Sequence, residues 1–124
     1  NDLKARDSLT ARDTALGAER LVQTILHSGS GLGGQAPALL LAAPPPIAPG
    51  DEIGAEMFHG GREKSLALAQ RYRAVAQKWG CGFFDVASVV GVDPADGIHY
   101  SEASHRALGD ALAEQVLSGG QLPI

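Results

Sequence analysis

An aspartate and a histidine three residues apart, Asp96 and His99, are the residues of this sequence best suited to chemistry. Gly97 lies between them and relaxes the turn, so the Asp96 carboxylate can reach Nδ1 of the imidazole. Such a contact fixes the tautomer of the ring and leaves Nε2 as a base, and it stabilises the imidazolium that forms when the base takes a proton. Chemistry of this kind also needs a nucleophile.

The spacing alone leaves a second interpretation open. A loop aspartate often caps the helix that follows it, and in that interpretation His99 is an ordinary surface residue. Asp93, six residues before His99, is also a competing partner for the imidazole. The types and spacing of these residues therefore do not decide between chemistry and capping.

Two short apolar runs, residues 38–43 and 83–86, predict strands that would position this loop. The first run has no polar alternation, which is typical of a strand buried on both faces of a parallel sheet, and the prolines at 44–46 end it. In open α/β sheets the reactive groups lie on loops past the carboxyl ends of strands, and residues 93–100 form such a loop.

Three segments with apolar residues near the helical period predict helices: residues 10–27, 62–79 and 101–117. In the second we expect an apolar stripe of Leu66, Ala69, Tyr72, Val75, Ala76 and Trp79. In the third we expect an apolar face of Leu108, Ala111, Leu112 and Val116, with Ser101 as the cap. Residues 44–59 predict a long loop and residues 118–124 a loose tail.

The predicted order is helix, strand, helix, strand, helix, which is half of an open α/β sheet. Two parallel strands do not form an independent sheet with both faces covered. We therefore expect something else to complete the fold.

Composition limits the classes of function. The 124 residues fit one domain at most, and 44% are apolar, which allows a core. The net charge is −4 and the ten lysines and arginines are scattered, so nothing indicates a nucleic-acid partner. No apolar run approaches the about 20 residues that span a bilayer, so we expect no membrane contact.

The cysteine and histidine content predicts neither a disulfide nor a metal site. Cys81 is the only cysteine, and we expect a small buried thiol, which is compatible with a reducing compartment. The location stays open, with the cytoplasm favoured. There is no His-x-x-x-His pair. We expect His27 to cap a helix end, and His59 and His105 to face solvent, so no cofactor is predicted. The sequence opens at Asn1 without a methionine, and we expect the natural start to lie elsewhere.

Several segments, in order, resemble one family. Asp96-Gly97-Ile98-His99 before a final helix resembles the last block of the SGNH hydrolases, also called GDSL esterases. Asn1-Asp2 resembles the end of the family's Gly-x-Asn-Asp block. Residues 39–46, Phe58-His59-Gly60-Gly61, Phe83-Phe84-Asp85 and residues 96–102 resemble its arylesterase and acyltransferase branch. The resemblance implies that residues 1–124 are the C-terminal part of one domain with a three-layer, flavodoxin-like α/β fold.

The resemblance also implies roles for single residues. His99 matches the general base and Asp96 the carboxylate that orients it. Asn1 matches the oxyanion-hole asparagine, and a donor of that kind is worth about 3 kcal/mol of barrier. A substrate pocket is implied as well, with three residues at its wall or rim: Ile98, Phe58 and Lys4. For Phe58 an ordinary buried aromatic is an equal alternative.

The family's nucleophile has no counterpart here. None of the serines follows Gly-Asp: Ser8, Ser28, Ser30, Ser65, Ser88, Ser101, Ser104 and Ser118. Ser28-Gly29-Ser30-Gly31 looks like a nucleophile elbow, but no strand precedes it. The nucleophile is therefore expected from the N-terminal portion of the same enzyme, present as a separate chain or outside this sequence.

The resemblance implies a serine esterase that cleaves small carboxylic esters, aryl or short-chain acyl, through an acyl-enzyme, with acyl transfer to alcohols as a further reaction. A carbohydrate O-acetylesterase is one alternative, and a non-catalytic fragment that pairs with a partner chain is another. The expected partners are a small-molecule ester, the N-terminal portion and, because relatives in this branch form oligomers, further copies of the enzyme.

Overall fold

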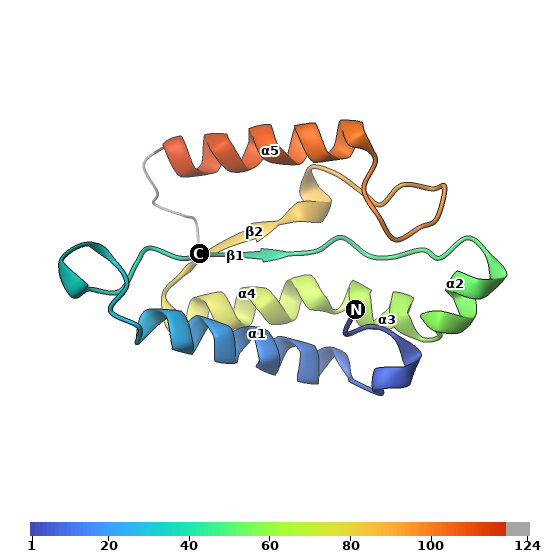
Figure 1. The fold of residues 1–124 in the computed structure, drawn as a ribbon, viewed down its shortest axis with the longest axis horizontal. Coiled ribbons are helices and arrows are strands. Elements are labelled where there is room, and N and C mark those ends of the chain that lie inside the picture. Colours follow the sequence, from blue (N-terminus) through green and yellow to red (C-terminus); the bar gives the residue numbers. More distant parts are fainter. Residues whose placement is uncertain (119–124) are drawn as a thin grey trace.

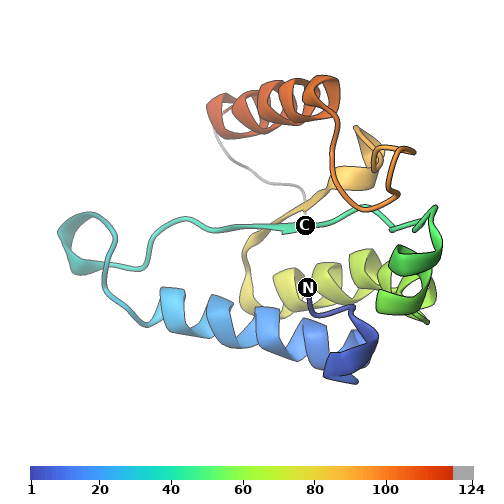
Figure 2. The same ribbon diagram turned by 45° about the vertical axis from the view of Figure 1, so that its right-hand side comes forward.

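A computed structural model describes residues 1–118 of the protein as three layers, with two strands between helices (Figure 1). Helices α1 (Ala11–Leu26) and α4 (Leu68–Trp79) lie on one side of the strands, and α5 (Glu102–Leu117) lies on the other (Figure 2). Within residues 1–118, no helix is long and apolar enough to cross a membrane. Most of the predicted tail, residues 119–124, lies outside the described residues.

Strands β1 (Leu40–Ala43) and β2 (Gly82–Asp85) pair in parallel, in a register that runs from Leu40 opposite Gly82 to Ala43 opposite Asp85. The two predicted strands and their parallel direction are confirmed. The direction follows from the helical crossover between them, which brings the chain back in parallel. The expectation that β1 is buried on both faces is wrong for the described residues. Ala43 is fully buried but Ala42 is exposed.

Helix α1 begins at a capping box and packs on α4. The Thr10 hydroxyl accepts from the Asp13 amide (3.1 Å), and the Asp13 carboxylate accepts from the Thr10 amide (2.8 Å). At the other end, His27 Nδ1 lies 2.7 Å from the Gln23 carbonyl, which confirms the predicted cap. The core under the sheet combines both helices and both strands: Val22, Ala43, Val75, Ala76, Cys81 and Phe83.

The single helix predicted over residues 62–79 is wrong: the segment forms two helices, α3 (Gly61–Leu66) and α4, interrupted at Ala67. The Ser65 hydroxyl donates to the Arg62 carbonyl (2.7 Å), and such back-bonding bends a helix. The break changes which leucine is buried. Leu66, expected in the apolar stripe, is 55% exposed, whereas Leu68 is 1% exposed.

The long loop predicted over residues 44–59 contains a helix, α2 (Glu52–Met57). Asp51 caps it by accepting a hydrogen bond from the Gly54 amide (2.5 Å). The segment carries too few residues for a helical period, and the cap was its only sequence signal. Short 3-10 turns lie at Ala5–Asp7, Leu32–Gly34 and Val86–Ser88.

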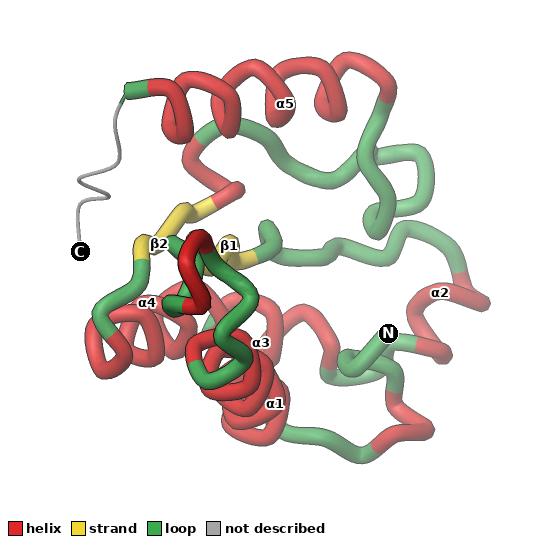
Figure 3. The backbone as a smooth tube through the Cα atoms, turned by 60° about the vertical axis from the view of Figure 1, so that its left-hand side comes forward, coloured by secondary structure: helices red, strands yellow, loops and turns green. Residues whose placement is uncertain are grey.

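Helix α5 begins after Ser101, whose hydroxyl accepts from the Ser104 amide (3.1 Å), as predicted. None of its residues is buried. The predicted apolar face is only half-buried at best, and Val116 is 66% exposed. Figure 3 shows the reason, since α5 lies across the strands from α1, α3 and α4 with no helix beside it. The observed fold is the predicted half of an α/β sheet.

Candidate active site

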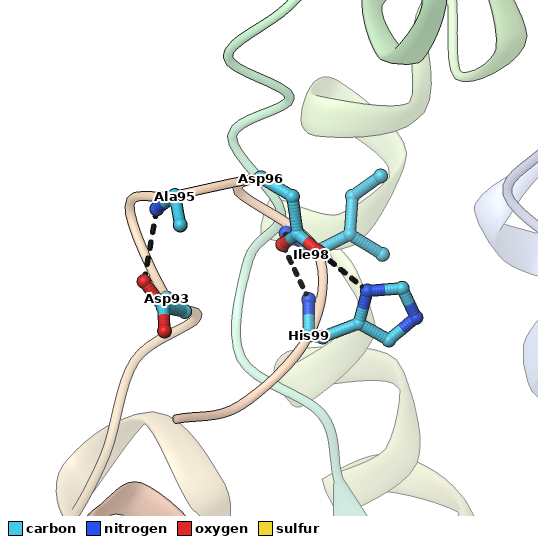
Figure 4. Close-up of polar contacts among 5 residues, drawn as sticks. All are labelled: Asp93, Ala95, Asp96, Ile98 and His99. Carbon is cyan, nitrogen blue, oxygen red and sulfur yellow. Dashed lines mark hydrogen bonds and ion pairs between the residues drawn. The ribbon is translucent and has the colours of Figure 1, made fainter. Parts of the chain in front are cut away.

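The loop after β2 brings Asp96 and His99 together. His99 Nδ1 lies 2.6 Å from Asp96 Oδ2 (Figure 4). The other carboxylate oxygen, Oδ1, accepts from the backbone amides of Ile98 (2.8 Å) and His99 (2.9 Å). The Asp96 carboxylate therefore holds both the backbone turn at residues 96–99 and the imidazole ring of His99.

The hydrogen bonds to Asp96 decide the protonation of the pair. The His99 amide, the His99 ring and the Ile98 amide lower the pKa of Asp96 from 3.8 to about 2. The carboxylate is therefore ionised near neutral pH and can only accept. Nδ1 must then carry the proton in this contact. In the neutral ring Nε2 is left unprotonated, and it points away from Asp96 in Figure 4.

Two contacts that the sequence left open, Asp93 with His99 and Asp96 with the end of the following helix, are not made. Asp93, the competing carboxylate, accepts from the Ala95 amide (2.9 Å) and is turned away from the imidazole (Figure 4). The cap of α5 is Ser101, so Asp96 does not cap the following helix. The pairing of Asp96 with His99 is therefore specific.

The pair is exposed, and stability does not explain its geometry. The His99 side chain is 81% exposed and the Asp96 side chain 40%. Exposed ion pairs contribute little to stability, because solvent screens them. The exposed His99 ring is accessible from outside the molecule.

The six residues singled out from the sequence line one hollow of about 690 Å³: Asn1, Lys4, Phe58, Asp96, Ile98 and His99. They come from the amino-terminal segment, the end of α2 and the loop before α5. The amino terminus lies beside α3 (Figure 1). The fold thus gathers residues from three segments that are far apart in the sequence, and their catalytic and binding roles stay predictions.

Phe58 is a buried aromatic that also lines the hollow, and its role in binding a substrate stays a prediction. Its side chain is 8% exposed and belongs to the buried set, yet it lines the hollow. The Lys4 ammonium lies 6.0 Å from the centre of its ring, a cation–π distance. Asn1 is exposed, and its backbone carbonyl accepts from the Lys4 amide (2.9 Å), which folds the amino-terminal segment over the hollow.

The sequence did not predict several residues that line the hollow. Ile53 and Met57 lie one helical turn apart on α2, and both line the hollow although they are 74% and 44% exposed. Tyr72 of α4 lines it too; burial, and to a lesser extent the charge of Asp2, raises the pKa of its hydroxyl. The cap at Asp51 was the signal that could have found α2 and its two apolar residues.

No serine or cysteine is among the residues of the 1–118 part that line the hollow. Cys81 is 5% exposed in the core below the sheet, where burial raises its thiol pKa. Ser28 and Ser30 bond to each other in a loop (2.7 Å), and Ser65 and Ser101 serve backbone groups elsewhere. In the described part of the chain no cluster of metal ligands is present.

Comparison with known proteins shows what this arrangement is similar to. No protein-family model matches the sequence, and no curated protein does. Among solved structures, an aryl esterase from M. smegmatis is 45% identical, with a TM-score of 0.87. A carbohydrate acetylesterase from Sinorhizobium meliloti is 37% identical, with a TM-score of 0.88.

A carbohydrate acetylesterase family member from Sinorhizobium meliloti is 35% identical, with a TM-score of 0.83. Each of the three matches covers 95% of this chain, but only 56% to 58% of the solved chain. The chain therefore spans a little over half the length of these esterases. Its fold matches the C-terminal half of these esterases, to which the sequence is 35% to 45% identical.

Proposed function

We propose that this chain supplies the general base, its orienting carboxylate and an oxyanion donor of a serine esterase. The observation that carries the proposal is the contact between His99 and an ionised Asp96 at the edge of a hollow, with Nε2 left free. The names of the similar proteins, aryl esterase and carbohydrate acetylesterase, support ester cleavage. The nucleophilic serine comes from the remaining portion of the domain.

In the proposed reaction, His99 Nε2 takes the proton of the serine hydroxyl as its oxygen bonds to the ester carbonyl carbon. The Asn1 side-chain amide donates to the oxyanion that forms. The protonated His99 then gives its proton to the departing alkoxide, and the acyl group stays on serine. Water repeats the sequence and releases the acid, whereas an alcohol in place of water gives a new ester. Asp96 holds the ring and stabilises its charged form throughout.

The hollow favours a small ester with an apolar part. Its wall combines Ile98, Phe58 and the exposed α2 residues Ile53 and Met57. Lys4, Asp2 and Asp51 also line it and offer polar contacts, and two similar proteins are named carbohydrate acetylesterases. A carbohydrate O-acetylesterase is therefore the second candidate. Turnover of 4-nitrophenyl acetate compared with an acetylated sugar separates the two.

The first test is mutation of the base in the complete enzyme, with both portions of the domain present. We expect His99→Ala to lower kcat/KM for 4-nitrophenyl acetate at least about a thousandfold, because loss of a triad member leaves only binding and the oxyanion hole. His59→Ala is the matched control, since His59 is exposed and lies outside the hollow. Its rate should stay within about twofold of the unsubstituted enzyme. Undiminished activity of His99→Ala would falsify the assignment.

The second test locates the nucleophile. A fluorophosphonate that labels activated serines is added to the 124-residue chain alone and to the complete enzyme. The mass of each polypeptide is then measured under denaturing conditions. We expect label on the complete enzyme only, at a serine outside these residues. Label on the chain alone would show that the nucleophile is one of its own serines. No label in either sample would favour the non-catalytic fragment.

A further inference from the structure

The loop that carries Asp96 and His99 touches a second loop far away in the sequence. The Ala48 amide donates to the Gly97 carbonyl (2.7 Å), and the Gly50 amide donates to the Asp96 carbonyl (3.3 Å). Residues 47–50, between β1 and α2, therefore run alongside the turn between the two residues of the pair. These backbone contacts act on the turn itself, so they fix where the pair lies relative to the sheet.

The approach is so close that only glycine fits at position 97. Gly97 is buried and has φ of +71°, a left-handed conformation that side chains disfavour. A Cβ atom built there would lie 1.7 Å from the Ala48 carbonyl oxygen and 2.2 Å from its carbon. Both neighbours are backbone atoms that cannot rotate away. Any side chain would force the two loops apart.

The second loop is itself anchored. The Ser65 hydroxyl of α3 accepts from the Ile47 amide (3.0 Å) while it donates to the Arg62 carbonyl (2.7 Å). Ser65 is 2% exposed and is not among the residues that line the hollow. Ile47, which the buried Ser65 hydroxyl holds, is the residue before Ala48, and Ala48 contacts Gly97. Ser65 therefore connects α3 to the turn at Gly97.

We propose that residues 47–50 form a backbone clamp that positions the Asp96–His99 pair, with Gly97 as the residue that permits the contact and Ser65 as its anchor. Both are positioning residues, and neither supplies a reacting group. The inference rests on the proposed function for its effect on rate. Its structural part stands on the contacts alone.

The kinetic test compares two glycines with the same backbone conformation. Gly80, after α4, has φ of +65°, but a Cβ there would meet nothing within 4 Å. In the complete enzyme we expect Gly97→Ala to lower kcat about a hundredfold, as a shift of about 1 Å in a catalytic group does, with KM for 4-nitrophenyl acetate changed less than about threefold. Gly80→Ala should stay within about twofold. Equal losses in both variants, or none in either, overturn the role of Gly97.

Ser65→Ala tests the anchor without a steric clash and covers the case in which Gly97→Ala does not fold. It leaves the buried Ile47 amide without its acceptor. We expect kcat to fall about tenfold with KM nearly unchanged, and Ser65→Thr, which keeps the hydroxyl, to recover most of the loss. Thermal unfolding gives the folded fraction at the assay temperature. A kcat per folded molecule equal to that of the unsubstituted enzyme overturns the proposal.

Hydrogen exchange separates this proposal from the proposed function, because it needs no turnover. In Ser65→Ala, amides in residues 47–50 and in residues 96–99 should exchange faster together, while those of α1 keep their rates. Unchanged exchange in residues 96–99 overturns the clamp. If exchange rises in both segments but His99→Ala remains active, the clamp stands and the esterase assignment fails.

Discussion

The two faces of the small sheet are covered very differently. On one face α1 and α4 pack against each other and against the strands, around buried Val22, Val75 and Phe83. On the other face lies α5, which has the same length as α1 but buries no residue. Trp79 and Lys78 of α4 even share the Glu19 carboxylate of α1, at 2.8 and 2.6 Å, and these contacts lower its pKa.

The difference teaches that an apolar pattern predicts a helix and the side of it that can be buried. Whether that side is buried depends on the rest of the fold. Leu108, Ala111 and Leu112 of α5 are only half-buried. The similar esterases are longer, and this chain matches 56% of the M. smegmatis structure. Tertiary packing supplies most of the stability of helices in proteins. Because α5 buries no residue, it depends mainly on its cap and its own hydrogen bonds.

The largest expected effect is on the free energy of unfolding, from a matched pair of leucines. Leu68→Ala on α4 should cost about 3 kcal/mol, because Leu68 is 1% exposed and its truncation leaves a cavity. Leu112→Ala on α5 should cost less than about 1 kcal/mol, since a half-exposed leucine loses little burial. Urea denaturation of the 124-residue chain measures both. Equal losses of unfolding free energy in the two variants would contradict the difference in burial between the two faces of the sheet.

The second prediction uses cysteine as a reporter of the closed face. Cys81 is 5% exposed and burial raises its pKa, so its thiol should react with a disulfide reagent more than about a hundredfold more slowly than in the urea-unfolded chain. A cysteine placed at exposed Ala107 of α5, with Cys81→Ser, should react nearly as fast folded as unfolded. Fast reaction of Cys81 in the folded chain would show that the core opens readily.

The smallest effect concerns the loop that joins the two faces. Asp96 has its pKa lowered from 3.8 to about 2, so its ionised form stabilises the folded chain. Because a lowered pKa gives stability that is present above 3.8 and lost as the pH falls towards 2, the deficit of Asp96→Asn should shrink across that window. Denaturation at several pH values measures it. Asp110→Asn, on α5, controls for the loss of one carboxylate, and an unchanging deficit for Asp96→Asn would contradict the prediction.

Much of the fold could be predicted because its signals are local. The apolar runs fixed both strands to within two residues, and the helical period with its caps placed α1 and α5. The errors fall where local and distant forces compete. Ser65 bonds to Ile47, eighteen residues away in sequence, and the helix breaks beside it. Residues 52–57 were too few to show a period, so α2 went unrecognised.

The candidate site divides in the same way. Asp96 and His99 are three residues apart on one turn, so their contact follows from local geometry that Gly97 permits. The walls of the hollow could only be guessed through a family resemblance, because Asn1, Phe58 and Ile98 belong to separate segments. Ile53, Met57 and Tyr72 were missed because their place depends on how α2 and α4 pack.

By itself the sequence predicted the types of most elements, because these depend on neighbours within a few residues. It also predicted the parallel direction of the strands, because a helix connects them. It placed Asp96 within reach of His99 but did not decide between that contact and helix capping. Only the tertiary structure decided that the amino-terminal segment, α2 and the loop before α5 meet at one hollow, that α5 is left half-covered, and that Gly97 must lie against Ala48. The physical reason is range: hydrogen bonds within a turn are encoded by adjacent residues, whereas a contact between loops exists only after the sheet and helices have placed both.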